Sequence, residues 1–175
     1  PSSELAPAAS SPWTGSGLVL TTQPLATLAE LLWDYPAGPQ TAAAYAGEAG
    51  PGTAAYLPLL AAGPGRLTLI TLHNTETAEA SVTLRIYDRH GTQQLVQMAA
   101  IPPHAERTFS LADLAPDLSA TEGYGTAWVT ATRGIAVVAR LHWVTASEAY
   151  RAATEGDTAL WLPGLSRRAL EGGAW

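Results

Sequence analysis

The feature that most constrains the fold is a series of short strand-forming runs, which recur about every 8 to 12 residues with turn residues between them. In the run 81–87, Val82, Leu84 and Ile86 alternate with polar side chains, as in a strand with one buried face. Seven such runs are predicted, at 53–60, 66–73, 81–87, 93–99, 106–111, 126–132 and 135–144. They predict an all-β fold, an antiparallel seven-stranded β-sandwich.

Composition limits the partners that the chain can bind. Hydrophobic residues make up 47% of the sequence and charged residues only 14%, so a packed core is expected rather than disorder. The net charge is −6 and every basic residue is arginine, which argues against nucleic acid and anionic membranes as partners. No apolar run approaches the length of a transmembrane helix, so no membrane insertion is expected. Cysteine is absent, which excludes disulfides and thiolate metal sites.

An internal repeat changes the interpretation of both ends of the chain. Residues 15–33 align with 125–143 at an offset of 110, and seven of the nineteen positions are identical. Residues 41–60 align with 146–165 at an offset of 105, with seven identities in twenty positions. Because the two matches are adjacent and in the same order, the chain is expected to contain parts of more than one copy of the same unit.

The repeat predicts that residues 12–35 form the last hairpin of a sandwich whose earlier strands are missing. Its turn is expected at Gln23-Pro24, where the intact unit is predicted to turn at Arg133-Gly134. Residues 158–165 are likewise predicted as the first strand of another sandwich. Unpaired strands need backbone partners and cover for their apolar side chains. The simplest solution is strand exchange with neighbouring copies, which is head-to-tail and produces an open filament.

Three parts are therefore predicted: an exchanged hairpin segment with a linker at 1–52, the β-sandwich core at 53–145, and an exchanged strand with a tail at 146–175. The extended N- and C-terminal segments are expected to pair with neighbouring subunits. The residues predicted for the subunit interface are large apolar side chains of these segments and one tyrosine at the start of the core: Trp13, Leu18, Val19, Leu20, Leu25, Leu28, Leu31, Trp33, Tyr56, Leu160, Trp161, Leu162, Leu165 and Trp175.

A helix is the competing interpretation of residues 24–35. Leu25, Leu28 and Leu31 have helical spacing, and Pro24 suits the first turn of a helix. The repeat favours a strand instead, because tertiary context often overrides local propensity.

The sequence gives little support for catalysis or for a cofactor. The four histidines do not have metal-binding spacing, and neither a phosphate-binding loop nor a nucleophile elbow is found. A calcium site at Asp113, Asp117 and Glu122 is an alternative to helix-capping roles for these carboxylates. No enzyme activity, cofactor or metal is predicted.

Six tryptophans raise a further alternative, a carbohydrate-binding module, because exposed aromatic rings stack on sugars and would make surface glycans a partner. Trp33 and Trp143 recur at equivalent positions of the repeat, which favours core or interface roles. Trp13 and Trp175 lie outside the regular pattern and are the best candidates for contacts between chains.

Several short motifs of the central unit support a resemblance: Tyr56-Leu-Pro-Leu59, Tyr87-Asp-x-x-Gly91-Thr, Leu114, Gly125-Thr-Ala-Trp-Val129 and Ile135-Ala-Val-Val138. Over about residues 53–145 the chain resembles the Ig-like β-sandwich repeat domains of secreted bacterial cell-surface proteins. The resemblance implies tandem domains, an extracellular location, a role in scaffolding or adhesion, and no catalytic residues.

The leading hypothesis is therefore a structural subunit of an extracellular, pilus-like bacterial filament, a homopolymer of this chain. The alternative is one repeat of a long tandem-domain surface or adhesion protein, in which the missing strands come from the same polypeptide. A single Asn, a single Met, many prolines and Arg in place of Lys are typical of a thermophile, although a GC-rich genome produces the same bias.

Overall fold

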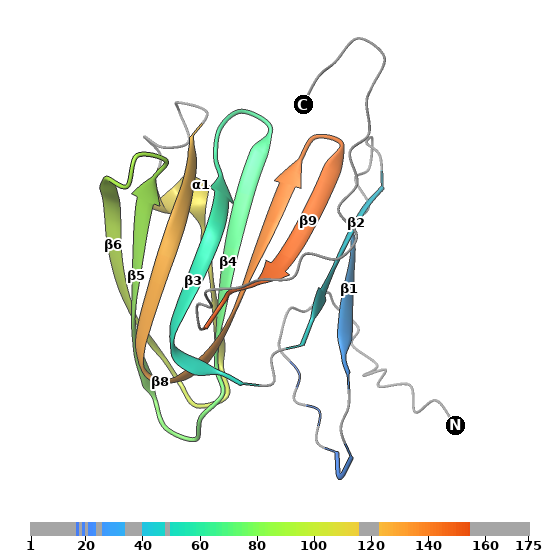
Figure 1. The fold of residues 1–175 in the computed structure, drawn as a ribbon, viewed down its shortest axis with the longest axis vertical. Coiled ribbons are helices and arrows are strands. Elements are labelled where there is room, and N and C mark those ends of the chain that lie inside the picture. The colour runs from blue at the N-terminus through green and yellow to red at the C-terminus, as the bar shows by residue number, and fades with distance from the viewer. Residues whose placement is uncertain are drawn as a thin grey trace, which may run out of the picture.

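The computed structural model describes residues 17, 19, 21–23, 26–33, 40–47, 50–115 and 123–154. Within these ranges the chain is almost entirely β-structure, with one short helix (Figure 1). The elements are β1 (Leu28–Trp33), β2 (Thr41–Ala46), β3 (Gly52–Ala61), β4 (Arg66–Asn74), β5 (Ala80–Asp88), β6 (Gln93–Ile101), β7 (Glu106–Ser110), α1 (Leu111–Leu114), β8 (Tyr124–Trp143) and β9 (Ala146–Arg151).

Seven of the strands form one curled sheet that is organised around β8. The order is β6-β5-β8-β4-β7, and β3 and β9 also pair with β8, always antiparallel. The first half of β8 pairs with β5 and β3, and its second half pairs with β4 and β9. The all-β class is thereby confirmed, and a sheet of seven strands is present. The predicted runs 126–132 and 135–144 are both part of β8, however, and the seventh strand is β9, which lies in the segment predicted as an exchanged strand and tail.

The turn predicted at Arg133-Gly134 is wrong, because β8 continues through these residues as one strand of 20 residues. Gly134 instead marks the place where β8 changes neighbours. The backbone N–H and the hydroxyl of Thr75 both donate to the Gly134 carbonyl, at 3.1 and 2.9 Å. A Cβ at position 134 would lie 3.0 Å from a carboxylate oxygen of Glu76, the end of a flexible side chain that could shift by a few tenths of an ångström to admit it.

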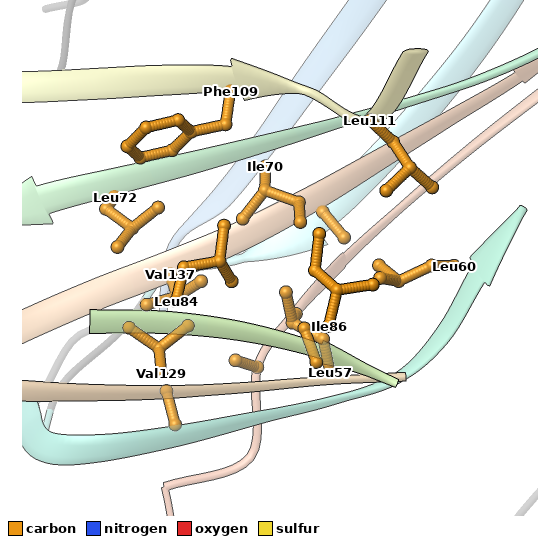
Figure 2. Close-up of a cluster of buried hydrophobic side chains, with 14 of the residues drawn as sticks. Leu57, Leu60, Ile70, Leu72, Leu84, Ile86, Phe109, Leu111, Val129 and Val137 are labelled. Atoms are coloured by element: carbon orange, nitrogen blue, oxygen red, sulfur yellow. The ribbon is translucent and has the colours of Figure 1, made fainter. Parts of the chain in front are cut away.

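The core lies on the inner face of the curled sheet. Figure 2 shows side chains from β3, β4, β5, β7 and β8 gathered there, among them Leu57, Ile70, Leu84, Phe109 and Val129. The predicted alternation in β5 is confirmed, since Val82, Leu84 and Ile86 are buried. Each such side chain gains roughly 1.5–3 kcal/mol from burial, before the entropy cost of ordering is subtracted.

A buried amide ties two loops to this core. Asn74, at the end of β4, is fully buried. Its Nδ2 group donates to the carbonyls of Ala78, Ile101 and Pro102 at 2.7, 3.0 and 3.1 Å, and its Oδ1 accepts from the N–H of Glu76 at 3.0 Å. Every polar atom of the side chain is therefore hydrogen-bonded, as a buried amide requires.

β1 and β2 form a separate two-stranded antiparallel sheet. Residues 28–33 are thus a strand, as the repeat predicted, and not the helix that their leucine spacing allows. Their partner differs from the prediction: β1 pairs with β2, which the sequence placed in a linker, whereas the predicted hairpin joined it to residues before Gln23. The local apolar spacing could not reveal this, because the strand partner is set by the tertiary environment.

Candidate functional site

The β1–β2 hairpin repeats the β8–β9 hairpin with the same register. Trp33 pairs with Thr41 and Ala29 pairs with Tyr45. At offsets of 110 and 105, the same positions in the main sheet are Trp143 with Ala146 and Ala139 with Tyr150, and these residues are paired as well. The correspondence that the sequence predicted is therefore confirmed for residues 28–33 and 41–46 at the level of strand pairing.

The two hairpins differ in what completes them. The second half of β8 has β9 on one side and β4 on the other. Within the described residues, β1 pairs with β2 alone. Leu28, at the start of β1, is 73% exposed, and Val19 before it is 60% exposed. A two-stranded ribbon is marginal in water by itself, so this hairpin needs further support.

Part of that support comes from β9, against which β2 lies. The Thr41 hydroxyl oxygen is 2.8 Å from the Ser147 hydroxyl oxygen, which is 3.1 Å from His142 Nδ1. Thr41 and His142 are both buried, so the three side chains form a shielded polar link between the two sheets. A longer contact, 3.4 Å from Arg151 Nη1 to the Gly47 carbonyl, lies at the other end of the seam.

A serine hydroxyl beside an imidazole is also the arrangement of a nucleophile and its base. Here the Ser147 hydroxyl contacts Thr41 on the hairpin, and His142 lies buried beneath it. Burial lowers the pKa of His142 below its ordinary value, and the positive charge of Arg140 lowers it further. The geometry therefore supports a structural role for Ser147 and His142 in joining β2 to β9, with the His142 imidazole favoured in its neutral form.

A tyrosine fastens β9 to β3 on the other side of the same region. The Tyr150 hydroxyl donates to the Leu59 carbonyl and accepts from the Leu59 N–H at 3.2 Å. Burial, opposed by the hydrogen bond to Leu59, raises the pKa of this phenol to about 12. Tyr45 holds the register position in β2 that Tyr150 holds in β9. The β1–β2 hairpin therefore has a tyrosine at the position from which β9 hydrogen-bonds to β3.

The outer face of the sheet carries a ladder of three side chains from adjacent strands. Tyr56 and Trp128 have nearly parallel rings, with centroids 6.1 Å apart, and the Arg85 guanidinium lies 5.3 Å from the Trp128 ring centroid. Because β3 and β5 flank β8 on opposite sides, Tyr56 and Arg85 approach Trp128 from both sides, which leaves its side chain 37% exposed. This weighs against sugar stacking on Trp128, and carbohydrate binding stays a prediction.

The predicted interface residues are divided between several places. Leu28, Leu31 and Trp33 lie together on β1, although the side-chain position of Trp33 is not described. Tyr56 belongs to the outer ladder instead, where it is 47% exposed. The remaining predicted residues apart from Val19 lie outside the described ranges: Trp13, Leu18, Leu20, Leu25, Leu160, Trp161, Leu162, Leu165 and Trp175.

Sequence reasoning missed the seam residues Thr41, Ser147 and His142. The available signal was the second repeat match, which aligns position 42 with Ser147 and so predicts the same structure for β2 and β9. It did not show that β2 packs against β9.

For the calcium alternative, Asp113 is described whereas Asp117 and Glu122 are not, and the described part of the chain contains no cluster of metal-ligating side chains. In the same ranges, no helix is long and apolar enough to cross a membrane.

Comparison with known proteins identifies a family and a fold. Residues 16–169 match the model of a family described as a family of unknown function, DUF5719. No curated protein matches the chain. Among solved structures, the crystal structure of Thermotoga maritima 1070 is similar with a TM-score of 0.52 and 11% identity, over 60% of this chain and 96% of that one. A sensory rhodopsin transducer from Anabaena is similar with a TM-score of 0.42 and 13% identity, over 50% and 92%. At these identities the first likeness shows the fold alone.

Proposed function

The chain belongs to the DUF5719 family, and we propose that it is a structural subunit of an extracellular bacterial filament, assembled head-to-tail by β-strand exchange. The observation that carries the proposal is the repeated hairpin. β1–β2 copies the pairing of β8–β9, but within the described residues β1 has no counterpart of β4 beside it. A strand of another copy would begin to complete this partial unit, as the counterpart of β3 beside the segment that precedes β1.

A two-sheet β-sandwich of the Ig-like type belongs to the same proposal. The two halves of β8 carry different neighbours, β5 and β3 on the first and β4 and β9 on the second, and side chains from both halves enter one core. This arrangement supports two facing layers joined by one long strand, the architecture of the tandem domains that the sequence resembles.

The repeat gives a register for the exchanged strand. In the main sheet Tyr56 lies opposite Trp128, and Ala55 lies opposite Val129. Moved by the repeat offsets, these pairs become Trp161 opposite Leu18 and Leu160 opposite Val19. We therefore assign residues 158–165 of one copy to a place beside residues 15–22 of the next.

This register explains why both terminal segments are apolar. Leu160 and Leu162 would take the places of Ala55 and Leu57, whose side chains are buried in the core of the main sheet. Each leucine that becomes buried contributes roughly 1.5–3 kcal/mol, which drives pairing between copies against the entropy of association.

The experiment compares the assembly of the full chain with that of two doubly substituted variants. Leu162→Asp with Leu165→Asp places carboxylates on the exchanged strand and should abolish filaments seen by negative-stain microscopy. Thr126→Asp with Val144→Asp adds the same charge at exposed positions of β8 and of the turn that follows it, and should leave filaments intact. Wild-type chain that remains monodisperse and monomeric at high concentration would contradict the proposal, and assembly only when two units are joined in one polypeptide would favour the tandem-domain alternative.

A further inference from the structure

The edges of the seven-stranded sheet are not equally protected. β7 is short and carries Glu106 and Arg107, and β9 is covered by β2. The outer edge of β3 contains Pro58 and is bridged at Tyr56 by Ala153. Short length, charge, proline and cover are the devices by which natural sheets prevent edge-to-edge pairing.

β6 has none of these devices. It spans Gln93–Ile101, nine residues without a charge, a proline or a glycine. In the part of the chain that the structure describes, β6 pairs with β5 alone and ends the sheet. On its solvent face Val96 is 46% exposed and Met98 is 71% exposed. Such an edge is a template for another strand.

The hydrogen bonds along β6 identify one backbone carbonyl that an incoming strand could use. Gln97 Nε2 donates to the Met98 carbonyl at 2.8 Å, so this carbonyl is satisfied by a side chain of its own strand rather than by a neighbouring strand. Replacement of that local hydrogen bond by the N–H of an incoming strand is close to neutral in free energy, because one hydrogen bond is exchanged for another.

We propose that β6 is a self-association edge, where two copies of this chain pair antiparallel about a two-fold axis at Gln97. In this register Val96 of each copy lies opposite Met98 of the other, so the exposed apolar side chains cover one another. The Val96 N–H then takes the place of Gln97 Nε2 on the Met98 carbonyl of the other copy. The absence of charge on β6 suits self-pairing, since an antiparallel two-fold would place a charge near the axis beside the same charge of the other copy.

The contact is isologous and uses neither the β1–β2 hairpin nor residues 158–165. It therefore adds a lateral contact to the proposed head-to-tail assembly, and the two can be tested separately.

The chain has no cysteine, so a single introduced thiol reports self-pairing directly. Gln97→Cys should give a disulfide-linked dimer on mild oxidation, because only a residue on the two-fold axis faces its own copy. Gln93→Cys should not, because the register places position 93 opposite Ile101 of the other copy, which leaves the two introduced thiols roughly 26 Å apart. Comparable cross-linking of both variants, or of neither, would overturn the proposal.

Sedimentation gives the second measurement. Met98→Lys should weaken self-association at least about tenfold, a change of about 1.4 kcal/mol. Thr126→Lys adds the same charge to the same outer face, two strands away, and should leave self-association unchanged. Met98→Lys should also leave a Leu18→Cys with Trp161→Cys cross-link intact. Loss of that cross-link would show that strand exchange depends on β6 and would overturn a separate lateral contact, whereas its absence in the parent with Gln97 cross-linking intact would sink the filament proposal alone.

Discussion

The hydroxyl oxygens of Thr41 and Ser147 lie 2.8 Å apart, although 106 positions of sequence separate the two residues. They join a hairpin near the start of the chain to the hairpin that it repeats near the end. The contact holds β2 against β9, while within the described residues the other edge of β1 has no strand beside it.

Thr41→Val should weaken this seam. Valine keeps the shape of threonine but removes the hydroxyl, and Ser147 then loses a partner in a part-buried site, at a cost of about 1 kcal/mol. Hydrogen exchange should be faster in β1 and β2 and unchanged in β4 and β5. Thr53→Val, at an exposed position of β3, is the matched control, and equal effects of the two variants would contradict a role for the seam.

Acid should loosen the same seam. Burial lowers the pKa of His142 in the folded chain below the ordinary value of 6.5, so the folded state favours the neutral imidazole. The unfolded chain binds the proton more readily, so the stability contributed by His142 is fully present above pH 6.5 and is lost as pH falls through the folded-state pKa. Burial lowers the pKa of His73 too, so it acts in the same direction.

Urea unfolding between about pH 8 and pH 5 measures this dependence. The midpoint should fall with pH in the parent chain, and His142→Gln should make the fall shallower, leaving the part that His73 contributes. A midpoint that is constant, or that rises as the solution is acidified, would contradict the account.

Asn74→Ala should destabilise the sheet strongly. The substitution removes the donor for three carbonyls in a fully buried site, and an unsatisfied buried group costs roughly 1–3 kcal/mol. Gln94→Ala removes an exposed hydrogen bond to Asp88 and should cost far less. Chemical denaturation of both variants checks the difference.

Gly125→Ala should also destabilise, for a steric reason. A Cβ at this position would overlap the backbone carbonyl of Tyr87 on the neighbouring strand, so β5 and β8 would have to separate. We expect a loss of roughly 1–3 kcal/mol. At Gly17 a Cβ meets nothing within 4 Å of the described atoms, so Gly17→Ala should be nearly neutral in the isolated subunit.

Much of the sheet was predictable because its strands follow local rules. The alternation of Val82, Leu84 and Ile86, and the glycine in the turn at Gly91, with φ of 82°, identify β5 and the hairpin to β6 without tertiary information. The continuity of β8 was not predictable, because Arg133-Gly134 resembles a turn and only the strands paired on either side show that β8 continues through it.

The candidate site was predictable only in part. The repeat anticipated β1 against its helical leucine spacing, since matching side chains implied matching structure. Neither the Thr41–Ser147–His142 seam nor the unprotected edge of β6 could be inferred, because both depend on which strands lie beside each other. The predicted role of the terminal apolar residues stays a prediction.

Disulfide trapping in the variant Leu18→Cys with Trp161→Cys tests the exchanged strand most directly. The proposed register has these positions opposite one another in neighbouring copies, so mild oxidation should give a ladder of covalent oligomers on a non-reducing gel. Thr22→Cys with Trp161→Cys, displaced by four residues or roughly 13 Å along the strand, should give little product. A disulfide closed within a single chain, or equal yields from both pairs, would contradict assembly by strand exchange.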